Sequence, residues 1–323
     1  MARGDLLSKL IASYGKDDEF RAVAEKIIAE EEQKNNNTLA KTLRKSLMVM
    51  GAKSSFKSFN TFMPTPSNVN EYLHLVNESI PHNNLVMSLQ NREILDLLKN
   101  EFRKSNDIKL RGLPLSNKIL FCGPPGSGKT LSAKVFANEV GLPLYVLKLD
   151  ALISSYLGET ASNIRKVFEF AQHTPCVLFL DEFDSLARSR EDNLEHNELR
   201  RVVNSLLLFI EQLQPKGFLI AATNLDNALD SAIWRRFDEV LWFGLPDLKS
   251  IEFYLNKKFK NLIIHIDLKA FAKDLKGLSY AEIERVCNQS IKHAVLDGRE
   301  GLEDFDFIKS MENEKRRKSG LKS

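Results

Sequence analysis

The sequence contains few cysteines and no segment that could anchor the chain in a membrane. Its 323 residues include three cysteines, Cys122, Cys176 and Cys287, which are odd in number and far apart. This pattern excludes a disulfide scaffold and indicates buried, reduced thiols in a cytoplasmic protein. No apolar run approaches the roughly 20 residues of a membrane span. No apolar core of a signal peptide follows residues 1–5, so no membrane partner is expected.

Charge of one sign and metal-binding clusters are also scarce. Lysines and arginines number 46 and acidic residues 43, so the net charge is only +3. The chain therefore lacks the strongly basic composition of nucleic-acid-binding proteins, and a nucleic-acid partner is not expected. The positive excess lies in residues 309–323, and we interpret the basic run 315–318 as a solvated tail. The sequence contains no cluster of cysteine and histidine residues, so a zinc site is not expected.

A glycine-rich segment stands between an apolar run and a run of helix formers. It matches the pattern G-x-x-x-x-G-K-[ST]. Glycines let backbone N–H groups converge on phosphate oxygens, and the following helix presents its N-terminus to the same anion. The pattern predicts that Lys129 reaches the β- and γ-phosphates of ATP and that the Thr130 hydroxyl binds Mg²⁺. The expected nucleotide-binding residues here are Gly123, Pro124, Pro125, Gly126, Ser127, Gly128, Lys129, Thr130 and Leu131.

Two adjacent carboxylates, Asp181 and Glu182, end the apolar run 176–180. Ligands bind at the carboxyl ends of parallel strands, so these carboxylates are expected beside the nucleotide. We predict that Asp181 binds Mg²⁺ and that Glu182 accepts a proton from the attacking water. The alternative is a carboxylate pair that merely stabilises the start of a helix through its dipole.

Apolar strand-like runs alternate with helical patterns between residues 119 and 243. This alternation predicts an α/β fold, with a parallel sheet sandwiched by helices. The expected strands are 119–122, 144–149, 176–180, 218–222 and 239–243. Amphipathic helices in residues 1–50 predict an N-terminal helical domain, which could be a stabilising appendage or a docking module for a partner. We divide the remainder into a linker (51–83), a nucleotide-binding domain (84–245) and a small helical lid domain with a basic tail (246–323).

Four segments occur together in one order, namely 123–130, 178–182, 221–224 and 229–238. In this order they resemble the AAA+ ATPases, and specifically a single-module bacterial member of the classic AAA clade. The resemblance implies an ATP hydrolase that uses Mg²⁺. It also implies that Asn224 orients the attacking water. Arg235 and Arg236 resemble the arginine fingers, which act on the nucleotide of a neighbouring subunit. The resemblance therefore implies a homo-oligomer, and a hexamer is expected.

Two further segments resemble functional parts of that family. Tyr156, Leu157 and Gly158 resemble the pore loop that grips an extended protein substrate, although Tyr156 could instead pack under its own loop. The segment 277–283 resembles the turn in which small residues, here Ala281, lie behind the adenine. The glycine-rich adenine-contacting stretch of the family is not found, and we expect residues 104–117 to replace it.

The function implied by the resemblance is a ring-forming motor that remodels, unfolds or threads a protein substrate. Chains of this layout resemble ATPases paired with a separate, subtilisin-like protease in bacterial defence systems, and residues 1–50 would contact such a partner. The sequence contains no His-Glu-x-x-His motif, so a fused metalloprotease is not expected. Two alternatives remain open: a nucleic-acid-associated motor, and a scaffold that uses ATP only to assemble.

Overall fold

The protein is described here as a computed structural model. It describes residues 69, 71–76, 85–149, 160–183, 197–224, 231–264 and 266–320. The expected N-terminal helices (1–50) and the expected pore loop (156–158) lie outside the described residues. No helix among the described residues is long and apolar enough to cross a bilayer.

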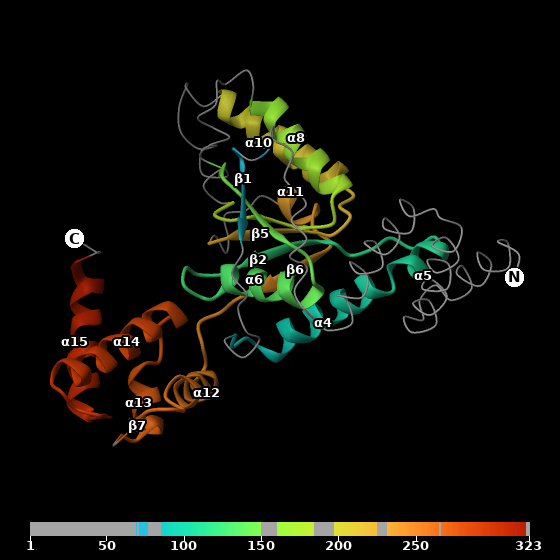
Figure 1. Cartoon of the computed structure of the whole chain (residues 1–323). Coiled ribbons are helices and arrows are strands. Elements are labelled where there is room, and N and C mark those ends of the chain that lie inside the picture. The colour runs from blue at the N-terminus through green and yellow to red at the C-terminus, as the bar shows by residue number, and fades with distance from the viewer. Residues whose placement is uncertain are drawn as a thin grey trace, which may run out of the picture. The chain divides into compact units, whose positions relative to one another are not determined.

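A six-stranded sheet forms the centre of the larger part (Figure 1). Its strand order is β1-β3-β4-β5-β2-β6, in which β1 runs antiparallel to β3 and all other neighbours are parallel. The predicted α/β fold with a parallel sheet is therefore confirmed. The strands are β1 (Leu73–Val76), β2 (Lys118–Cys122), β3 (Leu144–Leu147), β4 (Val177–Leu180), β5 (Phe218–Thr223) and β6 (Glu239–Trp242).

Helices cover both faces of this sheet, with α8 and α10 on one side and α4 and α6 on the other (Figure 1). Successive side chains of a strand point to opposite faces, so Leu120 packs under α8 and α10 while Phe121 packs under α4 and α6. A strand buried on both faces needs a continuous apolar run, which explains the sequence of β4. The helices are α4 (Leu89–Arg103), α6 (Lys129–Val140), α8 (Thr160–His173) and α10 (Asn197–Gln212).

The sheet includes one strand that the sequence analysis missed. Residues 73–76 form β1, which pairs with β3 from Leu73 opposite Leu147 to Val76 opposite Leu144. The assignment of residues 51–83 to a linker is therefore wrong for this segment. Four residues give too short a pattern to separate from a loop, and their stability comes from pairing with β3 and burying Leu73.

A second hydrophobic core is built entirely from residues 251–311. It contains Phe259, Phe271 and Phe307. The ring centroid of Phe307 lies 5.5 Å from that of Phe259 and 4.1 Å from that of Phe271. The helices that contribute to it are α12 (Leu248–Lys258), α13 (Leu268–Asp274), α14 (Tyr280–Leu296) and α15 (Asp304–Gly320). A short pair of strands, β7 (Ile263–Ile264) and β8 (Gly301–Leu302), closes this core. Two short helices lie elsewhere, α5 (Ser105–Leu110) and α11 (Ser231–Trp234).

The basic tail continues α15, the last helix that contributes to this core. Residues 315–318 belong to α15, and the Lys318 ammonium lies 2.8 Å from the Glu282 carboxylate of α14. One turn earlier, Glu314 is buried and forms an ion pair of 2.6 Å with Arg285. The interpretation of this run as a solvated tail is therefore wrong for Lys318. Composition could not show this contact because it depends on how α15 packs on α14.

The three cysteines are buried and free, as the sequence predicted. Cys176 precedes β4, and burial raises the pKa of its thiol to about 12. Burial likewise raises the pKa of the Cys287 thiol in α14 to about 12. These thiols stay protonated at neutral pH and serve as small hydrophobic side chains.

Candidate active site

The glycine-rich loop connects the end of β2 to the start of α6. Gly123 has a φ of 146°, and a Cβ atom there would lie 2.0 Å from the carbonyl oxygen of Phe243. Gly128, the N-cap of α6, has a left-handed φ of 99°. The first N–H groups of a helix lack partners within the helix, so the loop offers donors and a positive dipole end to an anion.

Lys129 begins α6 and is buried, with 7% of its surface exposed. Its ammonium group donates to the carbonyl oxygens of Gly123 at 2.6 Å and Pro124 at 2.9 Å. It also donates to Oδ1 of Asn224, at 2.9 Å. Asn224 directly follows β5, the strand beside β2. The structure thus brings together two predicted site residues that are 95 positions apart.

The carboxylate of Asp181 lies beside Thr130. The Thr130 hydroxyl donates to Oδ2 of Asp181 at 2.9 Å, and the backbone N–H of Glu182 donates to Oδ1 at 3.0 Å. Glu182 is exposed and has a φ of 52°, a left-handed conformation that residues other than glycine adopt at an energetic cost. The N–H of the following residue, Phe183, donates to the Ala222 carbonyl oxygen and so holds this turn against β5.

These residues fit a nucleotide phosphate with its metal ion. Ser127 in the loop is buried, and its hydroxyl has no hydrogen-bond partner among the described residues, which is costly unless a ligand supplies one. The Thr130 hydroxyl and the Asp181 carboxylate are hard oxygen ligands of the kind that Mg²⁺ prefers. Lys129 supplies the positive charge, and it can exchange its present oxygen partners for phosphate oxygens.

The start of α14 contacts the glycine-rich loop. The N–H of Ala281 donates to the Gly126 carbonyl oxygen at 3.1 Å. Ser279 caps α14 together with Glu282, and a Cβ at Gly126 would lie 2.8 Å from the Ser279 hydroxyl. Ala281 therefore lies at the loop, and its contact with the nucleotide stays a prediction. Tyr280 is half-buried, and burial raises its pKa.

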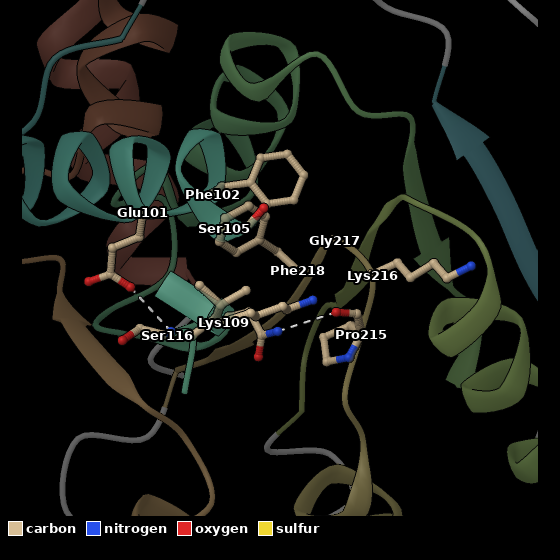
Figure 2. Close-up of a pocket in the computed structure, with 11 residues that line it drawn as sticks. Glu101, Phe102, Ser105, Lys109, Ser116, Pro215, Lys216, Gly217 and Phe218 are labelled. Carbon is tan, nitrogen blue, oxygen red and sulfur yellow. Dashed lines mark hydrogen bonds between the residues drawn. The ribbon is translucent and has the colours of Figure 1, made fainter. Parts of the chain in front are cut away.

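The segment expected to contact the adenine ends at the amino end of β2, whereas the glycine-rich loop follows the carboxyl end of the same strand. Ser116 donates through its N–H to the Glu101 carboxylate, and Asn117 does so to Asp238. Asn117 and Pro215 precede β2 and β5, and they line a pocket with Ser116 (Figure 2). The five residues of β2 separate this end of the sheet from the glycine-rich loop, a distance of about 16 Å. Ser116 and Asn117 therefore lie away from the glycine-rich loop, and a contact of residues 104–117 with the adenine stays a prediction.

Two residues that shape the site were missed in the sequence. Phe243 lies against Gly123 and packs on Phe121, with ring centroids 4.9 Å apart. Asn91 in α4 is 4% exposed, and its side-chain amide donates to the Trp242 carbonyl oxygen at 2.8 Å. This contact holds the start of α4 at the carboxyl ends of the strands, where the glycine-rich loop also lies. An asparagine on the apolar face of an amphipathic helix was the signal that could have revealed this contact.

The two predicted finger residues follow α11 and lie in a turn. Arg235 is exposed. Arg236 is partly buried and lies 3.4 Å from the carboxylate of Glu211 at the end of α10. None of the contacts given above joins either arginine to Lys129, Thr130 or Asp181. Tyr156, Leu157 and Gly158 lie outside the described residues.

A glycine-rich loop with a buried lysine, followed by strand-end carboxylates and a strand-end asparagine, defines a P-loop nucleoside triphosphatase site. Residues 119–245 match the family described as "ATPase family associated with various cellular activities (AAA)". The chain is 54% identical over 322 residues to the AAA family ATPase y4kL of Sinorhizobium fredii, and covers 98% of that protein. The chain belongs to the AAA ATPase family and is an ATP hydrolase.

Two larger proteins match a part of the chain. A putative cell division cycle ATPase of Plasmodium falciparum is 36% identical over 62% of the chain, which spans 17% of that protein. The ATP-dependent zinc metalloprotease YME1L1 of Homo sapiens is 34% identical over 68% of the chain, which spans 29% of that protein. Both matches therefore leave most of each larger protein without a counterpart here.

Proposed function

We propose that this ATP hydrolase works with Mg²⁺ as a ring-forming motor that remodels or threads a protein substrate. The observation that carries the proposal is that the charged residues expected to act on ATP lie at two separate places in the structure. Lys129, Thr130 and Asp181 gather at one glycine-rich loop, while Arg235 stands exposed after α11. A site that needs this arginine would be completed only by a second copy of the chain.

Residues of the same chain would bind ATP and start hydrolysis. Lys129 and the N–H groups of the loop would hold the phosphates, and Thr130 and Asp181 would hold Mg²⁺. The metal ion, when bound, neutralises charge on the phosphate oxygens. Glu182, exposed beside Asp181, would accept the proton of the attacking water, and the Asn224 amide would orient that water.

Arg235 and Arg236 would act on the nucleotide of the neighbouring subunit. A guanidinium keeps its charge at all working pH values and offers forked donors to the developing charge on the phosphoryl group. Glu211 would orient Arg236 through their ion pair, which leaves Arg235 as the more accessible group. A closed ring lets every subunit both give and receive this contact, so we propose a hexamer.

The proposed substrate is a protein chain. Tyr156, Leu157 and Gly158 would form a loop whose aromatic ring grips an extended peptide with little sequence preference. The similarity to YME1L1, which is named as an ATP-dependent metalloprotease, agrees with ATP-driven action on proteins. This chain lacks the His-Glu-x-x-His motif, so we propose that residues 1–50 dock a separate protease or effector in the cytoplasm of a bacterium.

Substitution of Tyr156 tests the substrate class. The ATPase rate is measured with unfolded protein and with single-stranded DNA, for the wild type, Tyr156→Ala and Tyr156→Phe. We expect stimulation by unfolded protein that is lost in Tyr156→Ala and kept in Tyr156→Phe, because grip needs the ring and not the hydroxyl. Stimulation by DNA alone would favour the nucleic-acid motor. Assembly with ATP but negligible turnover would favour the scaffold.

A further inference from the structure

The two tryptophans of the chain stack on each other beside the residues proposed as fingers. Trp234 and Trp242 have ring centroids 5.3 Å apart and an angle of 27° between their planes. Trp234 is the last residue of α11 and directly precedes Arg235. Trp242 is the last residue of β6, the edge strand of the sheet. The stack therefore connects the finger-bearing segment to a rigid element.

Buried residues hold both ends of this segment, since Ile233 and Phe237 lie in the core and are 1% and 7% exposed. The N–H groups of Arg236 and Phe237 donate to carbonyl oxygens within α11 itself, those of Ile233 and Trp234. The Arg236–Glu211 ion pair spans 3.4 Å, and the Glu211 side chain is 60% exposed, so solvent weakens it. Stacked indoles bury a large flat area and restrict rotation, which an exposed ion pair does not.

Backbone hydrogen bonds of the sheet hold Trp242 in place. Its residue pairs with Cys122 in the register of β2 and β6. Its carbonyl oxygen accepts from the buried Asn91 amide, and the N–H of Phe243 donates to the Cys122 carbonyl oxygen at 2.7 Å. Yet 52% of the Trp242 surface is exposed, so core packing alone does not account for a large aromatic side chain here.

We propose that Trp242 is a positioning residue for Arg235 and Arg236, which it orients by stacking on Trp234. This inference rests on the proposed function, in which the fingers serve the neighbouring subunit. Removal of the Trp242 ring would then impair the nucleotide site of the neighbouring subunit and leave the subunit's own nucleotide site intact. A different role is physically open, because the backbone of Trp242 lies beside the glycine-rich loop of its own subunit.

The kinetics of single variants give the first part of the test. Trp242→Ala should lower kcat of the homogeneous ring about 3- to 10-fold, as expected for loss of an aromatic pair. KM for ATP should stay unchanged, since Lys129 and the loop are intact. Trp242→Phe should restore most of kcat, because a smaller ring can still stack. Trp234→Ala should resemble Trp242→Ala, and the double variant should be no worse than either.

Mixed rings separate the two possible roles. Lys129→Ala subunits keep their fingers but lack a working site, whereas Arg235→Ala subunits keep their site but lack a finger. Trp242→Ala subunits should regain activity when mixed with Lys129→Ala subunits, which supply fingers. They should not regain it with Arg235→Ala subunits. The opposite pattern would show that Trp242 supports its own site and would overturn the proposal.

A control mixture tests the proposed function independently. Lys129→Ala and Arg235→Ala subunits together should recover activity if fingers act across subunits. Failure of this mixture in rings that demonstrably contain both variants would count against the proposed function and not against the tryptophan stack alone. Unchanged kcat in Trp242→Ala, or loss of ring assembly in that variant, would overturn the positioning role. Where Trp242→Ala is poorly folded, Trp242→Leu provides the same comparison with the apolar volume kept.

Discussion

The Lys129 ammonium lies 2.9 Å from the Asn224 side-chain oxygen and so connects the start of α6 to the end of β5. Asn224 is therefore placed to influence both the binding of phosphate and the orientation of water. The neutral amide matters here, because it accepts from Lys129 without neutralising the lysine charge. Any group at position 224 that competes more strongly for Lys129 would weaken nucleotide binding.

Asn224→Asp should lower ATP affinity about tenfold, because a carboxylate would pair with Lys129 and repel the phosphates. Calorimetric titration with ATP measures this change. Asn224→Ala is the matched control, since it removes the amide without adding charge. It should bind ATP more tightly than Asn224→Asp while hydrolysing it slowly. Equal affinities of the wild type and Asn224→Asp would show that the contact has no part in binding.

Glu182→Gln should keep ATP affinity and lower kcat by about 100-fold or more, since it removes the base and retains the shape. Steady-state hydrolysis combined with ATP titration measures both quantities. Glu169→Gln, an exposed carboxylate on α8, is the control and should leave both unchanged. Normal turnover in Glu182→Gln would mean that another group accepts the proton.

Gly123→Ala should disrupt the glycine-rich loop, because the new methyl group would lie 2.0 Å from the Phe243 carbonyl oxygen. We expect a loss of about 2–4 kcal/mol in the free energy of unfolding, together with weak ATP binding. Gly112→Ala is the control, since its Cβ meets no atom within 4 Å. It should cost only the left-handed strain of about 1–2 kcal/mol. Urea denaturation compares the two, and equal losses would show that strain alone decides.

Lys318→Ala should lower ATP affinity about 2- to 5-fold, because the Lys318–Glu282 pair supports the Ser279 cap that lies against Gly126. The effect is small since 43% of the Lys318 side chain is exposed. Lys318→Arg should restore affinity, and Arg316→Ala, an exposed residue of α15, is the control. ATP titration is the measurement. If truncation after residue 314 leaves affinity intact, the tail has no role in the site.

Asp306→Asn should destabilise the helical core of residues 251–311 at neutral pH, because the Arg299 guanidinium loses a charged partner. The two hydrogen bonds from Arg299 hold the pKa of Asp306 below its usual range. Stability from this pair is complete above the pKa of a free carboxyl and is lost as the pH falls through the lowered pKa. Thermal unfolding from pH 7 to pH 3 should therefore show less acid dependence in Asp306→Asn. Asp304→Asn, exposed on the same helix, should behave like the wild type.

The sequence by itself determined the parts of the protein that depend on neighbouring residues. An apolar run followed by a glycine-rich turn and helix formers predicted β2, the loop and α6, because each of these has a short pattern with a physical cause. Apolar runs likewise predicted β3, β4, β5 and β6 and, through alternation with helices, the parallel sheet. The motif order also predicted the family. These features need no knowledge of which distant segments meet.

Only the tertiary structure decided the contacts between distant segments. β1 exists because β3 offers it a partner, and Lys318 matters because α15 packs against α14. Ser116 and Asn117 lie at the end of the sheet opposite the loop, where their backbone N–H groups donate to the Glu101 and Asp238 carboxylates. The Trp234–Trp242 stack joins α11 to an edge strand. Each contact depends on the register and packing of elements far apart in the chain, which local patterns do not specify.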